Sequence, residues 1–157
     1  MKIEFWSLGK PHEPYVTPGV EDFTARIQNY FPVEWRILIP KKSTGTGKPE
    51  KWKQQESELV LAALMPDDYL VALDENGKTL TSLKLAQFIQ KRGNESVKRM
   101  IFLIGGAYGL DEKILSIAKF SWSLSPLTFP HQLVRLILSE QVYRACSIIR
   151  NEKYHHG

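Results

Sequence analysis

The chain has 157 residues, of which 43% are hydrophobic and 24% are charged. This composition excludes the disordered and fibrous classes, and the length gives room for one domain over residues 1–157. A formal net charge of +4, with an isoelectric point near 9.1, favours an anionic partner over a cationic one.

Strands and helices are predicted to alternate along the whole chain. The hydrophobic periodicity and the capping and turn residues predict, in order, strand 2–8, helix 20–31, strand 33–39, loop 41–48, helix 49–65, strand 69–74, turn 75–78, helix 82–92, strand 100–104, a short helix capped by Asp111, strand 120–124 and helix 132–150. Pro130 is expected to be the first residue of the last helix. Alternation with wholly apolar middle strands predicts an α/β fold, a largely parallel sheet flanked by helices.

The single cysteine and the hydropathy pattern indicate a cytoplasmic protein. Cys146 cannot form an internal disulfide, which fits a reducing compartment, and its place in an apolar helix favours core packing over a nucleophilic role. No apolar run reaches the roughly 18–20 residues of a membrane span. Because residues 2–8 have the pattern of a strand, we expect no signal peptide and no membrane contact.

Three predicted strand ends carry residues suited to a ligand site. Leu73-Asp74, Gly105-Gly106 and Leu124-Ser125 follow strands, and parallel sheets bind ligands at the carboxyl ends of their strands. The segment 123–131 adds hydroxyls, two prolines and a histidine before a helix, which suits a rigid ligand-binding loop. A glycine turn after a strand often serves only to reverse the direction of the chain. The glycine motifs that bind phosphate are missing from this sequence. The histidines lack the spacing of metal ligands, so we expect no metal.

A series of short motifs runs in order along the chain: Gly9-Lys10, Leu73-Asp74, Gly77-Lys78, Ile104-Gly105-Gly106, Gly109-Leu110, Ser121-Trp122-Ser123-Leu124-Ser125, Leu127-Thr128, Pro130-His131, Arg135, Glu140-Gln141, Tyr143-Arg144-Ala145 and Tyr154-His155. In combination they resemble the RlmH family of SPOUT-class methyltransferases. The resemblance covers the whole chain and is densest beyond residue 100.

The resemblance implies a fold, a reaction and a cofactor. It implies a C-terminal trefoil knot, although chains as a rule do not knot. It implies transfer of a methyl group from S-adenosylmethionine to N3 of pseudouridine 1915, in the helix 69 loop of 23S rRNA on the assembled ribosome. The cofactor contacts of the family fall on Leu73, Gly105, Leu124, Ser125, Pro126, Leu127, Thr128 and Phe129.

The resemblance also implies a homodimer in which the tail of one subunit completes the site of the other. The catalytic candidates are His131, Arg144, Tyr154 and His155. The imide proton of the base must leave, and histidine, with an ordinary pKa of ~6.5, suits a proton acceptor at neutral pH. The alternatives are that His131 only caps its helix, that Arg144 only pairs with Glu140, and that the tail is disordered.

The basic residues favour RNA contact. Lys41, Lys42 and Lys48 lie in a glycine-containing loop, and Arg135 follows His131 by one helical turn on roughly the same side. We predict that these four side chains bind rRNA phosphates, in a salt-dependent way; the alternative for the lysines is a solvated surface. Two other classes stay open from the residues alone, a non-catalytic RNA-binding module and a nucleotide-dependent oxidoreductase or kinase.

Overall fold

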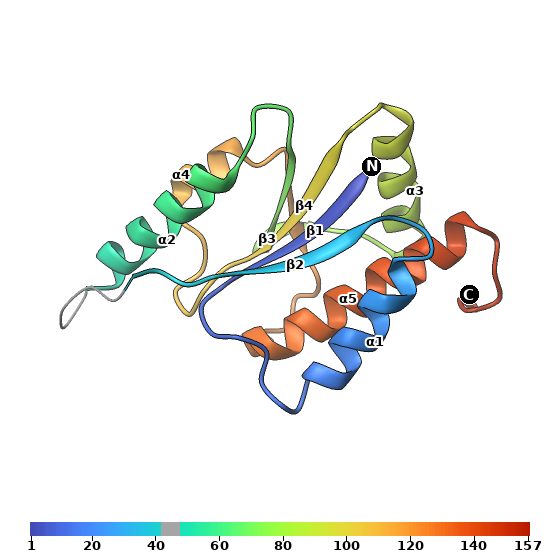
Figure 1. The fold of residues 1–157 in the computed structure, drawn as a ribbon, viewed down its shortest axis with the longest axis horizontal. Coiled ribbons are helices and arrows are strands. Elements are labelled where there is room, and N and C mark those ends of the chain that lie inside the picture. The colour runs from blue at the N-terminus through green and yellow to red at the C-terminus, as the bar shows by residue number, and fades with distance from the viewer. Residues whose placement is uncertain (42–47) are drawn as a thin grey trace.

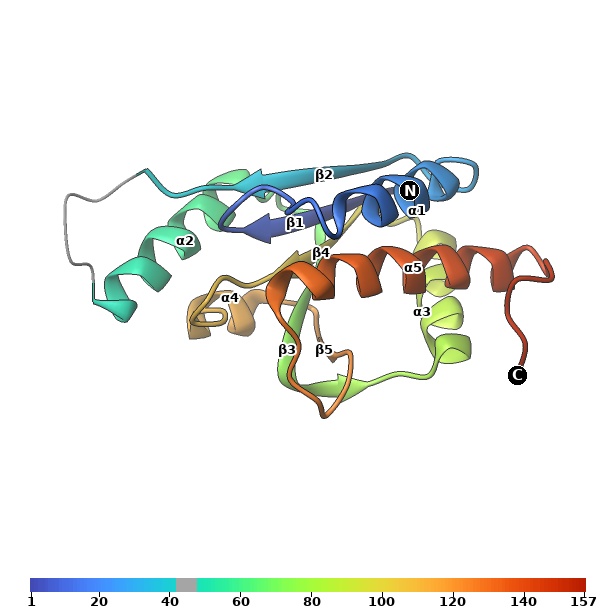
Figure 2. The same ribbon diagram turned by 90° about the horizontal axis from the view of Figure 1, so that it is seen from below.

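The computed structural model describes residues 1–41 and 48–157, so the predicted RNA-binding residue Lys42 lies outside the described residues. A five-stranded sheet forms the centre of the molecule (Figures 1 and 2). Its strands are β1 (Lys2–Leu8), β2 (Val33–Leu38), β3 (Tyr69–Thr79), β4 (Arg99–Ile104) and β5 (Phe120–Ser123). They lie in the order β2-β1-β4-β3-β5, and each of these neighbouring pairs is parallel, which confirms the predicted α/β fold.

Helices cover both faces of the sheet. One face carries α1 (Thr17–Ile27), α3 (Ser82–Asn94) and α5 (His131–Ile149), and the other carries α2 (Pro49–Ala63) and α4 (Glu112–Ile117) (Figure 2). In β1, Ile3 and Phe5 pack under the first layer, while Trp6 and Leu8 pack under the second. A strand covered by helices on both faces favours apolar residues at successive positions, which is why residues 100–104 of β4 form a continuous apolar run.

The long helix α5 lies in the middle of its layer, between α1 and α3 (Figures 1 and 2). Its buried side chains Leu138, Val142 and Cys146 join the core. Burial raises the pKa of the Cys146 thiol to about 12, so the thiolate is suppressed and Cys146 is a packing residue, as predicted. Among the described residues, no helix has both the length and the apolar character needed to cross a bilayer.

The boundaries of α1 and α5 differ from the prediction for reasons visible in the structure. The helix expected over residues 20–31 begins at Thr17 and ends at Ile27, because the Gln28 side chain bonds the backbone of Val33, donating at 2.6 Å and accepting at 3.2 Å, and so turns the chain into β2. Helix α5 begins at His131, and Pro130 is its N-cap residue, with a ψ of 145°, where the sequence predicted the first helical position.

The turn predicted over residues 75–78 is wrong, because β3 continues to Thr79. The strand leaves the β5 ladder after Leu73 and rejoins it at Lys78, so residues 74–77 form a bulge. An ideal Cβ on Gly77 would lie 2.6 Å from the carbonyl carbon of Ser121, so only glycine lets the two strands approach here. The bulge displaces Asp74 from the ladder at the carboxyl end of the paired segment.

A buried ion network closes the opposite end of the sheet. Arg99 donates to Glu4 at 2.8 Å and to Asp68 at 2.8 Å, and Arg36 approaches Glu4 at 2.9 Å. Glu4 is fully buried, and a buried carboxylate is tolerated only when its charge is paired. The network therefore links β1, β2 and β4, and it leaves the segments that follow their carboxyl ends free to form a site.

Candidate functional site

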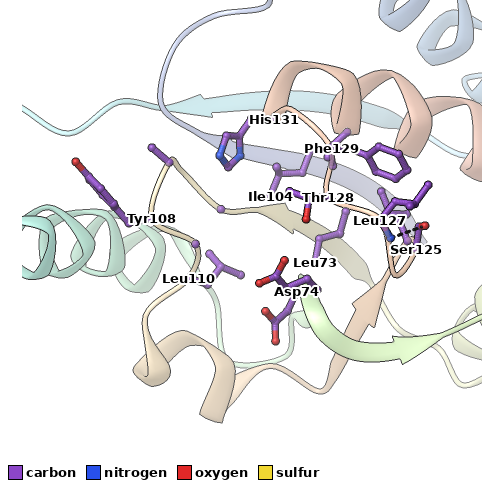
Figure 3. Close-up of a pocket in the computed structure, with 16 residues that line it drawn as sticks. Leu73, Asp74, Ile104, Tyr108, Leu110, Ser125, Leu127, Thr128, Phe129 and His131 are labelled. Atoms are coloured by element: carbon purple, nitrogen blue, oxygen red, sulfur yellow. Dashed lines mark hydrogen bonds between the residues drawn. The ribbon is translucent and has the colours of Figure 1, made fainter.

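A cavity of about 420 Å³ lies at the carboxyl ends of β3, β4 and β5 (Figure 3). That volume suits a ligand of cofactor size. Of the eight residues predicted to bind the cofactor, seven line it: Leu73, Gly105, Leu124, Ser125, Leu127, Thr128 and Phe129. The eighth, Pro126, is exposed and is not part of the lining. The predicted catalytic residue His131 stands at the rim.

Strand register brings the walls of this cavity together. Leu73 pairs with Ile104 on one side and with Trp122 on the other, so the three strands end at one level. The chain after β4 then turns tightly, with the Gly109 amide donating to the Gly106 carbonyl at 3.0 Å. Gly109 has a φ of +77°, which favours glycine, so the glycine motif after β4 has a structural reason as well as a place in the cavity wall.

The loop between β5 and α5 is held by its own hydroxyl groups. Ser123 Oγ donates to the Ser125 carbonyl at 3.0 Å, and Ser125 Oγ accepts from the Leu127 amide at 3.0 Å. Leu127 is left 69% exposed while it lines the cavity. A large apolar side chain held in the open beside a cavity is a contact surface for a ligand.

Two carboxylates at the cavity were not among the predicted site residues. Asp74 and Glu75 lie in the β3 bulge and line the cavity (Figure 3). The sequence placed Asp74 at a strand end but assigned Glu75 to a turn, and only the bulge brings both to the ligand side. Carboxylates accept hydrogen bonds from hydroxyl and ammonium groups, so this wall suits the polar part of a ligand.

A second cavity, of about 510 Å³, adjoins the first and was not foreseen from the sequence. It lies between α2, the start of α5 and the segment that connects β1 to α1. Its lining consists of Leu8, Gly9, Lys10, Glu13, Tyr15, Trp52, Glu56, Gly106, Ala107, Pro130, His131, Gln132 and Arg135. Ala107 and His131 line both cavities, so the two spaces share a boundary.

Arg135 is placed differently from the prediction. Its side chain is buried, at 1% exposure, and donates to the Lys10 carbonyl at 2.7 Å, with a second nitrogen 3.1 Å from His12 Nδ1. Gln132 supports the same segment by donating to the Pro11 carbonyl at 3.2 Å. The burial is at odds with the predicted contact to RNA phosphates, and the guanidinium instead holds the wall of the second cavity.

The most unusual group in the second cavity is the Glu56 carboxyl. It is 1% exposed, and neither of its oxygens has a hydrogen-bond partner within the described chain. An ideal Cβ on Gly106 would lie 2.4 Å from Glu56 Oε2, so the glycine makes room for the carboxyl. Burial raises the pKa of Glu56 to about 7. The sequence contained a weak signal, because Glu56 lies one helical turn before the apolar Val60 on the inner face of α2.

The predicted catalytic residues do not all come together within one chain. Tyr154 donates to Glu140 at 3.0 Å, and Arg144 donates to Glu140 at 2.9 Å and lies 3.2 Å from His155 Nδ1. This cluster is on the second half of α5, whereas His131 is the first residue of the helix (Figure 2). Glu140 and Arg144 lie about 14–20 Å from His131 along the helix, at 1.5 Å per residue, so the packed tail is away from the cavities of its own chain.

Comparison with known proteins shows one consistent likeness. A family model described as predicted SPOUT methyltransferase matches residues 1–155. A protein of Cytophaga hutchinsonii named ribosomal RNA large subunit methyltransferase H is 40% identical over 156 residues, which cover 99% of this chain and 100% of that one. One of the same name from Parabacteroides distasonis is 39% identical, with 99% of each chain covered.

A solved structure also resembles the fold. The probable methyltransferase from Bordetella pertussis superposes with a TM-score of 0.57 over 92% of this chain and 96% of that one. At 14% sequence identity, this likeness concerns the fold alone.

The unpaired Glu56 carboxyl predicts a specific dependence of stability on pH. Its pKa is about 7 in the folded chain against an ordinary 4.5, so its protonation favours the folded state. That contribution is complete below about pH 4.5 and is lost as the pH rises through about 7. Between about pH 5 and about pH 9 the wild type should therefore lose roughly 2–3 kcal/mol relative to Glu56→Gln. Urea unfolding at both pH values measures this difference.

The matched control is Glu58→Gln, which removes the same charge from an exposed position of α2. Its free energy of unfolding should follow that of the wild type at both pH values, within about 0.5 kcal/mol. Equal pH responses of the wild type and Glu56→Gln would mean that the pKa of Glu56 is not raised in the folded chain.

Proposed function

The chain belongs to the SPOUT methyltransferases, in the group named ribosomal RNA large subunit methyltransferase H, and we propose that it methylates N3 of pseudouridine 1915 in the helix 69 loop of 23S rRNA. We propose further that the methyl donor is S-adenosylmethionine, that the substrate is the assembled ribosome in the cytoplasm, and that the C-terminal segment is threaded as the trefoil knot of the family.

The observation that carries the cofactor proposal is the chemistry of the first cavity. Leu73, Leu127 and Phe129 offer apolar walls to an adenine ring, and the loop before α5 lines the cavity beside them. Asp74 and Glu75 offer acceptors to ribose hydroxyls and to an ammonium group. When bound, S-adenosylmethionine supplies a methyl group on a sulfonium sulfur, which becomes neutral on transfer.

Alignment is the main demand that this reaction makes on the protein. The target nitrogen and the methyl group have to be held in near-attack geometry, and the imide proton has to leave. His131 stands at the boundary of the two cavities, where it can contact the base while the first cavity holds the cofactor. The residues of the chain therefore bind, orient and accept a proton, and the electrophile comes with the cofactor.

We propose that the functional unit is a homodimer in which the tail acts across the interface. Within one chain, Tyr154 and His155 pack against Glu140 and Arg144 on the second half of α5, away from the cavities. A second copy that packs along α5 in the opposite direction would bring its tail to the cavities of the first. An aromatic side chain followed by histidine suits stacking on a base that has left its loop.

We propose that the substrate RNA is bound by exposed lysines. Lys41 and Lys48 flank the start of α2 and are exposed, and Lys42 completes the proposed set from outside the described residues. Each lysine that neutralises a phosphate releases counterions, so the contribution of this segment falls with salt.

The decisive test is transfer of labelled methyl groups to ribosomes that lack the modification, with mass spectrometry of the modified nucleoside. Leu127→Ala tests the cofactor cavity in the same assay. Because Leu127 is exposed in the free protein, its truncation should leave the free energy of unfolding within about 0.5 kcal/mol of wild type. Affinity for S-adenosylmethionine, measured by calorimetry, should fall about tenfold, since the apolar contact is worth roughly 1.4 kcal/mol.

Lys113→Ala, at an exposed position of α4 outside both cavities, is the control and should bind the cofactor normally. Unchanged affinity of Leu127→Ala would remove this loop from the cofactor site.

Deletion of residues 154–157 tests the tail. Cofactor affinity and dimerisation should stay close to wild type, while methyl transfer should fall by ~10² or more, the scale for losing a positioned acid–base group. Mixing the deletion variant with Leu127→Ala at a limiting cofactor concentration should restore part of the activity, because each mixed dimer then holds one intact cavity facing one intact tail. Normal turnover of the deletion variant would contradict the role of the tail, and a mixture without recovery would confine each tail to its own subunit.

A further inference from the structure

We propose that the second cavity receives the target pyrimidine ring, flipped out of its RNA loop, and that the Glu56 carboxylate accepts the N3 proton of that ring. The inference rests on the proposed function, because it assigns a place to the substrate of that reaction. It goes beyond it by naming a base pocket and a proton acceptor that the sequence motifs do not include.

The position of the second cavity fits the acceptor of the methyl group. Transfer requires the nucleophile and the methyl carbon to approach within about 3–3.5 Å, so donor and acceptor must occupy adjoining spaces. Ala107 and His131 form the common boundary of the two cavities, and Gly106, next to Ala107, touches the space of the Glu56 carboxyl. A ring in the second cavity therefore lies directly beside a cofactor in the first.

The walls of the second cavity have the chemistry of a nucleobase site. Trp52 and Tyr15 line it, and aromatic faces stack on a flat ring of any sequence context. Buried polar groups are normally paired, yet Arg135 Nε and both oxygens of Glu56 have no partner within the described chain. An imide presents a carbonyl, an N–H and a second carbonyl in a row. The unpaired donor of Arg135 matches a carbonyl, and the unpaired acceptor of Glu56 matches the N–H.

The proton transfer completes the reaction without a further reagent. At neutral pH the imide nitrogen carries a proton, and its lone pair becomes available only when the N–H bond breaks. Glu56 takes that proton. The electron pair of N3 then forms the bond to the methyl carbon, and the bond between that carbon and the sulfonium sulfur breaks with its pair left on sulfur. Glu56 returns its proton to water when the methylated ring leaves.

The surroundings of Glu56 raise the pKa of its carboxyl, which suits a proton acceptor. Burial raises the pKa of its carboxyl to about 7, and Lys53 and the Trp52 indole on the same helix oppose that rise. A proton acceptor is most effective when its pKa lies near the working pH. The other titratable or charged groups that face the cavity are Lys10, Glu13 and Tyr15 from the segment after β1, and His131 and Arg135 from α5. Since only the ionised carboxylate accepts a proton, the rate should rise with pH through about 7.

The experiment compares Glu56→Gln, Glu56→Asp and the exposed control Glu58→Gln in single-turnover methyl transfer from labelled S-adenosylmethionine to unmodified ribosomes. Glu56→Gln should lower the rate at least 100-fold, and Glu56→Asp should keep part of the activity with a displaced pH profile. Glu58→Gln should match the wild type in rate and profile. Cofactor affinity, measured by calorimetry, should stay within about twofold in all three variants, because Glu56 lies outside the first cavity.

The outcomes separate this inference from the proposed function. A wild-type chain that transfers no methyl group to N3 overturns the proposed function, and the base pocket with it. An active wild type together with a Glu56→Gln rate within about threefold of it overturns the inference alone. So does a Glu56→Gln chain that dimerises more weakly in sedimentation, because the cavity would then belong to the contact with a second copy.

Discussion

Parallel pairing of all five strands is the constraint from which both cavities follow. Each connection must return the chain to the side of the sheet where the strands begin. The strands β1, β3, β4 and β5 therefore all have their carboxyl ends on the opposite side. The polar and glycine-rich segments that follow those strands then have no other place to lie. The ion network of Glu4, Asp68 and Arg99 lies at the side where the strands begin, and both cavities lie at the side where they end. The stabilising ion pairs and the candidate site are therefore at different ends of the sheet.

Two oppositely charged side chains, Arg135 and Glu56, are buried at the second cavity, and they differ in their hydrogen bonding. Arg135 is bonded to the Lys10 carbonyl and close to His12, whose pKa is lowered by burial and by the neighbouring guanidinium. Neither Glu56 oxygen has a hydrogen-bond partner among the described residues, and Lys53 and the Trp52 indole only partly offset the effect of burial on its pKa. A protein under selection for stability alone would fill or pair this site, because an unpaired buried carboxyl lowers the free energy of unfolding above the pKa of the group. Such an arrangement is typical of a functional site.

The sequence predicted the parts of the fold that local pattern determines. Runs such as residues 100–104 are apolar because both faces of β4 are covered, and that pattern is visible without a structure. The error over residues 75–78 arose because Asn76-Gly77 is also a turn signal, and only the contact with Ser121 explains the glycine. Glu56 was missed, and the burial of Arg135 was not foreseen, because burial of a charged residue depends on what packs against it. The placement of the tail relative to His131 likewise depends on tertiary structure, and periodicity carries no information about a knot.

Within one chain the tail packs on the second half of α5, away from the cavities at the first residue of the helix, and this has a kinetic consequence for the proposed dimeric enzyme. Under that proposal, a lone chain carries a cofactor cavity and a tail that belong to two different active sites, and neither site is complete. At concentrations below the dissociation constant of the dimer, the observed rate should therefore vary with the square of the enzyme concentration, and above it in simple proportion. A freshly synthesised chain would remain inert until it met a second copy, so the activity of the enzyme in a cell is set by its abundance as well as by its chemistry.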